Sequence, residues 1–354
     1  MSPTDAAGLK ERVEKALAHF LLDQRALLVG IDPALVTVAE TIERFVLQGG
    51  KRLRPAFAYW GFRGAGGDDS DEVVAAAAAL ELVQASALIH DDVMDASDTR
   101  RGEPSVHRRF EVMHGAQSWD GDAKAFGAGA AILLGDLCLA WSDELLRRSG
   151  IDVAALLRAR PVFDLMRTEV IAGQYLDVHA QATADSSLQR ASTVARYKAA
   201  KYTVERPLLL GAAIANAPAT LRATYSGYGL PLGEAFQLRD DILGVFGDPS
   251  ETGKPAGDDL REGKRTYLIA AAFAAADEPT AARLRAGLGN PLLDAAGVQQ
   301  LREIIVGTGA LARTEERIAN LTEASLQALA EGSLAAGTGE MLASLAKAAT
   351  HRTG

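Results

Sequence analysis

The chain has 354 residues, of which 48% are hydrophobic and 23% charged, and its formal net charge at pH 7 is −9. This composition is normal for a globular protein with a sizeable core, and the acidic balance argues against nucleic-acid binding, which needs a basic face. The single cysteine, Cys138, fits a reducing compartment. The sequence shows neither an apolar signal core nor an apolar run of the roughly 20 residues that span a bilayer. We therefore expect a cytoplasmic protein with no transmembrane segment.

Strong helix formers dominate the whole sequence, and no Pro/Ser/Gly linker divides it, so we expect a single all-α domain over residues 1–354. Hydrophobic periodicity predicts helices at residues 8–28, 33–48, 51–63, 71–95, 103–113, 124–148, 152–180, 187–203, 205–216, 218–247, 264–276, 278–287, 295–330 and 336–349. The glycine-rich segments 113–127 and 246–266 break the periodicity and are expected to be loops.

The predicted helix 71–95 is apolar nearly all round, which is typical of a bundle interior, yet it ends in Asp91, Asp92 and Asp95. Because the helix dipole disfavours negative charge at this end, the cluster needs a cationic partner. Asp240 and Asp241 end the predicted helix 218–247 in the same way. Two carboxylate clusters that meet in one cavity would bind Mg²⁺, which completes its ligands with water and phosphate oxygens. The alternative is two solvated charge clusters at helix ends.

Basic residues accompany both clusters. They are Lys51 and Arg54 after a Gly-Gly turn, Arg100 and Arg101 after the first cluster, and Lys254 and Lys264 after the second. Arginine offers phosphate a bidentate fork and lysine a point charge. The pattern predicts two anionic sites, one bound through metal and one bound directly by cations.

Six motifs in order along residues 48–266 resemble those of the trans-isoprenyl diphosphate synthases: GGKRLRP, LIHDDVMD with RRG, GQYLD, YKAAKYT, FQLRDD and GKPAGDDLREGKRT. The resemblance implies one polyprenyl synthetase domain, a helical bundle around a deep central cavity, and usually a homodimer. It implies that isopentenyl diphosphate is joined head to tail to an allylic diphosphate in a Mg²⁺-dependent reaction.

The resemblance also implies roles for individual residues. Three Mg²⁺ ions would be held by Asp91, Asp95 and Asp240, with Asp92 and Asp241 in support. The isopentenyl diphosphate pocket would contain Lys51, Arg54, Gln84 and Arg101. The allylic diphosphate would be bound by Arg100, Lys198, Lys254 and, as a weaker match, Lys264. Gln237 would lie near the reacting carbons, and Gln174 and Asp177 would support the cavity wall.

Two positions depart from the family's pattern. Gly244 stands where many relatives have a fifth-position aspartate, so binding of the third ion would depend on Asp240, either alone or with Asp241 acting through water. Ala199 follows Lys198 where relatives have threonine, and the chain therefore lacks a hydroxyl that often stabilises the carbocation. We expect activity in spite of both.

Product length is predicted from Ser86 and Ala87, the fifth and fourth residues before Asp91. Family members that stop at fifteen carbons often carry aromatic residues there, so two small residues favour geranylgeranyl diphosphate, with twenty carbons. Farnesyl diphosphate or a longer product stays an alternative, because another side chain could form the floor, and plain helix packing would also explain both residues. A class I terpene cyclase and a non-catalytic synthase subunit are the alternatives of another class.

Overall fold

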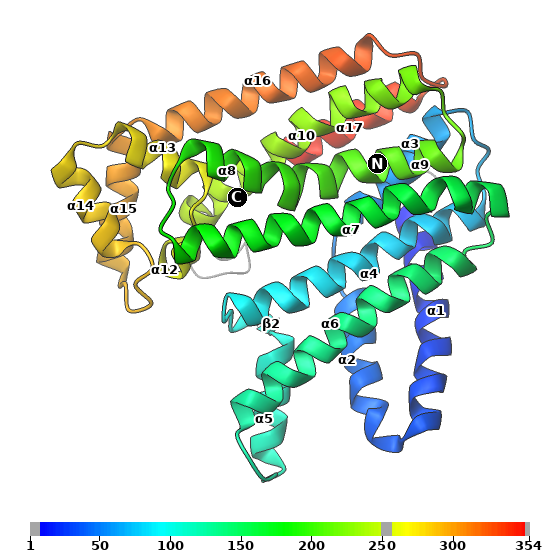
Figure 1. The fold of residues 1–354 in the computed structure, drawn as a ribbon, viewed down its shortest axis with the longest axis horizontal. Helices are drawn as coiled ribbons and strands as arrows, with labels where there is room; N and C mark the ends of the chain where they lie inside the picture. Colours follow the sequence, from blue (N-terminus) through cyan, green and yellow to red (C-terminus); the bar gives the residue numbers. More distant parts are fainter. Residues whose placement is uncertain (1–7, 249–256, 351–354) are drawn as a thin grey trace. The chain divides into compact units, whose positions relative to one another are not determined.

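The computed structural model describes residues 8–248 and 257–350, and it confirms the predicted all-α fold (Figure 1). The helices are α1 Leu9–Ile31, α2 Val36–Leu47, α3 Leu53–Gly64, α4 Asp71–Met94, α5 Val106–Ala116, α6 Ala123–Arg148, α7 Val153–Ala182, α8 Leu188–Val194, α9 Arg206–Ile214, α10 Ala219–Phe246, α12 Asp258–Glu262, α13 Tyr267–Ala275, α14 Glu278–Gly287, α15 Ala295–Gly307, α16 Ala310–Ala330 and α17 Thr338–Thr350. A short 3₁₀ turn, η2 Pro33–Leu35, precedes α2, and a π-helix, η3 Ala195–Glu205, lies between α8 and α9. Strands β1 Thr99–Arg100 and β2 Glu103–Pro104 pair antiparallel.

Most predicted helices are present, and five predictions were wrong in detail. The predicted helix 103–113 begins with the strand β2, and the predicted loop 113–127 is helical at both ends, where α5 ends and α6 begins. The predicted helix 295–330 is two helices, because Gly309 adopts a left-handed conformation with φ 73° and restarts the chain as α16. The predicted helix 187–203 changes to the wider π geometry at Ala195. The predicted loop 246–266 contains the short helix α12. Hydrophobic periodicity does not report a break at a single glycine, a change of helix type or a short polar helix.

Contacts divide the chain into two compact units, residues 1–161 with 210–217 and residues 162–209 with 218–354. That the whole chain works as one catalytic domain stays a prediction. In the first unit, α4 is the central helix and packs along α6 (Figure 1). The Ser70 side chain caps its N-terminus by accepting a bond from the Val73 amide, and the alanines that follow, Ala76–Ala79, are fully buried. Small side chains there allow α6 to approach closely.

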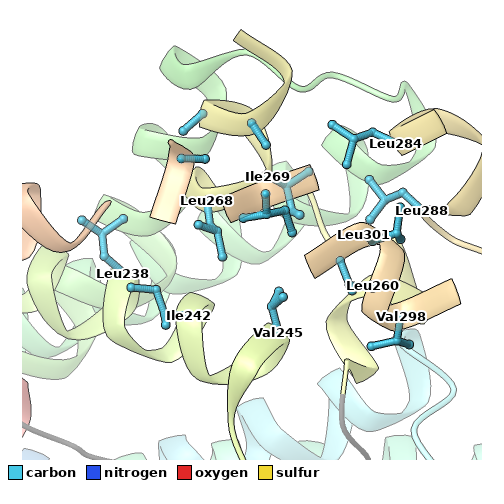
Figure 2. Close-up of a cluster of buried hydrophobic side chains, with 14 of the residues drawn as sticks. Leu238, Ile242, Val245, Leu260, Leu268, Ile269, Leu284, Leu288, Val298 and Leu301 are labelled. Atoms are coloured by element: carbon cyan, nitrogen blue, oxygen red, sulfur yellow. The ribbon is translucent and has the colours of Figure 1, made fainter. Parts of the chain in front are cut away.

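The second unit is organised around α10, which packs against α16 and η3. Figure 2 shows the buried cluster at its C-terminal end, where apolar side chains from α10, α12, α13, α14 and α15 meet: Leu238, Ile242, Val245, Leu260, Leu268, Ile269, Leu284, Leu288, Val298 and Leu301. Burial of each large aliphatic side chain stabilises by roughly 1.5–3 kcal/mol. The cluster therefore holds α12 and the start of α13 against the turn of α10 that carries Asp240 and Asp241.

Two helices, α4 and α6, are long and apolar enough to span a membrane when judged by length and composition. The most apolar window is 72% buried within the protein in α4 and 39% buried in α6. Burial of that extent identifies α4 as a core helix, since apolar composition is required there too. The absence of a transmembrane segment stays an expectation.

Candidate active site

One face of α4 carries several of the predicted site residues. Gln84, Ala87, Leu88, Asp91 and Asp95 recur at spacings of three or four and are all half-buried. This spacing places them on one side of a helix. Ser86 and Ile89, which lie between them, are buried, with exposed fractions of 4% and 0%. Of the two residues predicted to set product length, Ala87 therefore lies on the same face as Asp91, whereas Ser86 packs away from it.

A salt bridge explains how three aspartates can end a buried helix. The Asp92 side chain is 0% exposed, and its Oδ1 accepts a hydrogen bond of 2.9 Å from Nε of Arg100 and a second bond from Nη2. The same Nη2 lies 3.7 Å from Oδ2 of Asp91. Pairing of β1 with β2 holds Arg100 beside the helix end. Arg100 is thus the cationic partner that the helix dipole requires. It lies closer to Asp92 than to Asp91.

Arg101 lies against the Gly-Gly turn that carries Lys51. Its Nη1 donates hydrogen bonds to the carbonyl oxygens of Gln48 and Phe45, at 2.6 and 3.3 Å, and its guanidinium lies 5.7 Å from the centre of the Phe45 ring. A methyl group at Gly50, whose φ is 95°, would lie 3.9 Å from Nη2 of Arg101. The structure therefore brings together two parts of the predicted isopentenyl diphosphate pocket that are about fifty residues apart in sequence.

Several basic side chains gather at this turn. Desolvation lowers the pKa of Arg101, and the positive charges of Arg52 and Arg100 lower it as well, whereas the carboxylates of Glu81 and Asp92 raise it. Lys51 is exposed and Arg54 half-buried on the adjoining turn. A site where cations disfavour one another's charge is stabilised by a bound anion.

Arg52 is a residue that sequence reasoning did not place in any role. It is 4% exposed, and its Nη1 donates a 2.6 Å hydrogen bond to Oε2 of Glu81 on α4, while Nη2 donates to the Val46 carbonyl at 2.8 Å. The pair anchors the turn before α3 on α4. The sequence signal for this ion pair was Glu81, because a carboxylate inside an otherwise apolar stretch of a helix needs a buried partner.

The second acidic pair separates into two environments. Asp240 is half-buried, whereas Asp241 is 4% exposed. Its Oδ1 accepts a 2.8 Å hydrogen bond from Nε2 of Gln237, and its Oδ2 accepts one from the Tyr267 amide at 3.3 Å. Burial, and after it the negative charges of Asp259 and Asp240, raise the pKa of Asp241 to about 8, although the hydrogen bonds from Gln237 and the Tyr267 amide lower it. This environment fits Asp241 as a supporting group and Asp240 as the better candidate for a metal ligand.

The space beside Gly244 is filled by a carboxyl group from another helix. A Cβ atom added there would lie 1.8 Å from Oδ2 and 2.4 Å from Cγ of Asp259, which comes from α12. The carboxyl group of Asp259 thus occupies the place where a fifth-position aspartate would begin. No larger residue fits at 244 unless Asp259 moves.

The second unit also places three further site residues together. Nζ of Lys198 lies 2.7 Å from Oδ2 of Asp177, and Nζ of Lys264 lies 3.9 Å from the same oxygen. Gln174 is half-buried one turn earlier on α7. Lys254 lies outside the described residues. Ala199 is 5% exposed, so its side chain packs within the protein.

The donor set fits Mg²⁺. Asp91, Asp95 and Asp240 offer carboxylate oxygens, which are the ligands that this hard cation prefers. Within residues 8–248 and 257–350, no three His, Cys, Asp or Glu side chains are arranged to hold a metal ion by themselves. An ion that takes part of its shell from water and substrate phosphate needs no such group. The convergence of Asp91 and Asp240 on one cavity stays a prediction.

Comparison with known proteins identifies the same family. Residues 36–305 match the model of the polyprenyl synthetase family. The geranylfarnesyl diphosphate synthase of Aeropyrum pernix is 31% identical, over 84% of this chain and 87% of that protein. The geranylgeranyl diphosphate synthase of Saccharolobus solfataricus is 32% identical over 76% of each chain. A crystal structure of geranylgeranyl pyrophosphate synthase from Corynebacterium glutamicum, complexed with isoprenyl diphosphate and magnesium, superimposes with a TM-score of 0.94 at 43% identity, over 97% of this chain and 98% of that one.

Proposed function

Because this chain belongs to the polyprenyl synthetase family and is a prenyltransferase, we propose that it makes geranylgeranyl diphosphate by joining isopentenyl diphosphate head to tail to allylic diphosphates. The face of α4 that carries Gln84, Ala87, Asp91 and Asp95 is the main support for this proposal. It offers, along one helix, a polar group for one diphosphate, the small side chain of Ala87 beside a hydrocarbon tail and carboxylates for metal.

Departure of the diphosphate group from the allylic substrate is the difficult step. Asp91, Asp95 and Asp240 are proposed to hold three Mg²⁺ ions, which would neutralise charge on the leaving diphosphate. Arg100, Lys198, Lys254 and Lys264 are proposed to bind the same group. Charged groups that are already in position stabilise the developing anion without reorganisation.

The second substrate is proposed to bind at the positive turn before α3. Lys51, Arg54 and Arg101 would hold the diphosphate of isopentenyl diphosphate, with Gln84 beside them. Binding there presents the double bond of isopentenyl diphosphate to the allylic carbon, and this positioning contributes much of the rate. Gln237 would lie near the reacting carbons, and apolar side chains would exclude water from the carbocation. The departing pyrophosphate would accept the proton released in the final step.

The length of the product is proposed from Ala87. Its methyl group, on the face of Asp91, leaves room for a tail that grows along α4. Ser86 is buried, so any effect it has on length would be indirect. Farnesyl diphosphate and longer products are the alternatives, because relatives of similar identity carry names with different product lengths.

A homodimer is proposed from the exposed apolar side chains of α6. Phe126, Ile132 and Leu133 are 38%, 47% and 63% exposed, although they belong to an apolar helix. Clustered exposed apolar side chains are typical of an interaction surface. A cytoplasmic location is proposed from the single, buried cysteine.

The proposal is tested by incubating the purified protein with Mg²⁺, isopentenyl diphosphate and, in separate reactions, dimethylallyl, geranyl and farnesyl diphosphate. We expect geranylgeranyl diphosphate by chromatography and no product after chelation of the metal. A linear product of another length would refute the proposed product length and leave the proposed reaction in place. A cyclised hydrocarbon would indicate a terpene cyclase, and no product from any primer would indicate a non-catalytic subunit.

A further inference from the structure

Two lysines that are proposed to bind the allylic diphosphate meet at a single buried carboxylate. Oδ2 of Asp177 lies 2.7 Å from Nζ of Lys198 and 3.9 Å from Nζ of Lys264, and the Asp177 side chain is 11% exposed. Oε2 of Glu262 lies 3.8 Å from Nζ of the same lysine, Lys264. The two ammonium groups reach Asp177 from different elements, Lys198 from η3 and Lys264 from the turn after α12.

The fold builds this arrangement through a close approach of two backbones. Gly173 of α7 lies against η3, and a Cβ atom there would be 2.4 Å from the backbone nitrogen of Lys198. Asp177 follows Gly173 by four residues, so it lies on the same face of α7 one turn later. The glycine of GQYLD thus permits the contact that the aspartate of the same motif makes. The backbone of Lys264 is held to α12, because its amide donates a 3.0 Å hydrogen bond to the Asp259 carbonyl.

The charges in this group have a clear physical consequence. Two ammonium groups around one carboxylate oxygen would repel each other if the carboxylate were absent, and the repulsion is stronger where water is excluded. Asp177 offsets this repulsion, and with Glu262 beside Lys264 the two ammonium groups face two carboxylates. The two lysines can therefore be held close together before any anion is bound. The carboxylate itself cannot bind diphosphate, so its part is to hold the cations.

We propose that Asp177 is a positioning residue that keeps Lys198 and Lys264 side by side, so that both can contact the diphosphate leaving group. This inference rests on the function proposed above, in which these lysines bind the allylic diphosphate. Asp177 acts through the lysines and touches no substrate atom. Its effect is therefore on the step in which charge develops on the leaving group.

The same helix offers a matched control. Glu169, two turns before Asp177 on α7, also joins two cations: Oε1 accepts a 2.5 Å bond from Nζ of Lys201, and Oε2 accepts a 2.6 Å bond from Nε of Arg206. Its side chain is 12% exposed, close to the 11% of Asp177. Neither Lys201 nor Arg206 belongs to the proposed site. Loss of Glu169 therefore tests what a broken buried ion pair does without a role in catalysis.

The experiment compares Asp177→Asn, Asp177→Glu and Glu169→Gln with the wild type in steady-state turnover, after circular dichroism has checked the fold. We expect Asp177→Asn to lower kcat by about 10- to 100-fold, as loss of a residue that orients a binding group usually does, with the KM for isopentenyl diphosphate within about threefold. Asp177→Glu should recover most of the loss, because it restores a carboxylate. Glu169→Gln should lower the unfolding midpoint and keep kcat within about threefold.

A second measurement does not depend on turnover. Pyrophosphate with Mg²⁺ should raise the thermal unfolding midpoint of the wild type and of Glu169→Gln, and raise that of Asp177→Asn much less. The inference is overturned if Asp177→Asn behaves like Glu169→Gln in both measurements, or if Asp177→Glu is as impaired as Asp177→Asn. A wild-type protein that forms no product would overturn the proposed function instead, so the two failures are distinguishable.

Discussion

Replacing Glu81 with glutamine should weaken both the stability of the protein and its binding of one substrate. The carboxylate of Glu81 accepts a 2.6 Å hydrogen bond from Arg52, and the two side chains are 7% and 3% exposed. Glutamine keeps the shape and removes the charge. The guanidinium of Arg52 would then stay buried. Among the ion pairs of the described residues, its remaining carboxylate partner would be Glu14, 3.6 Å from Nε. Breaking a buried pair by removing one partner costs about 3–5 kcal/mol.

The Glu14 contact and the backbone carbonyls of Val46 and Leu47, which accept hydrogen bonds from Nη2 of Arg52, should reduce this loss. We therefore expect a cost of about 2–3 kcal/mol. The matched exposed pair is Arg147 with Asp143, which are 48% and 29% exposed. Asp143→Asn should cost about 0.5 kcal/mol or less, because solvent screens the charges. Urea denaturation followed by circular dichroism measures both variants.

The functional consequence follows from the position of Arg52 in the turn that carries Lys51 and lies against Arg101. Glu81→Gln should raise the KM for isopentenyl diphosphate by roughly 10-fold and change the KM for the allylic substrate by less than about threefold. Steady-state kinetics with each substrate varied in turn measure this difference. Equal stability of Glu81→Gln and Asp143→Asn, or equal changes in the two KM values, would refute the reasoning.

Three further variants test the site. Gly244→Asp displaces the carboxyl end of the Asp259 side chain and brings two carboxylates together, so it should lower stability by about 1 kcal/mol, the low end of overpacking costs. The double variant with Asp259→Gly should regain most of this loss in urea denaturation, and no recovery would mean that the contact is not the cause. Ala87→Phe should shorten the product at a similar rate, as read by chromatography, and an unchanged product would place the floor elsewhere. Asp91→Asn should lower turnover by at least about 100-fold with an unchanged circular dichroism spectrum, since it removes a ligand of the proposed metal; near-normal turnover would exclude that role.

Local patterns in the sequence determined the helices and the chemistry of the candidate site. Periodic apolar residues predicted α4 and α10 because a helix must bury one side or be buried entirely. Acidic residues at the end of an apolar helix are costly, so Asp91 and Asp240 indicated a cation before any contact was known. The six ordered motifs added the reaction class, which the family match confirmed.

Tertiary structure alone decided which charges neutralise one another. Arg100 pairs with Asp92, Arg52 pairs with Glu81 over a separation of 29 residues, and Lys198 pairs with Asp177 over 21. Tertiary structure also decided that the carboxyl group of Asp259 lies beside Gly244, and that Ser86 is buried whereas Ala87 is only half-buried. Periodicity reports the environment of a residue along its own helix, whereas these contacts join different elements. They depend on how closely two backbones approach, which is a property of packing.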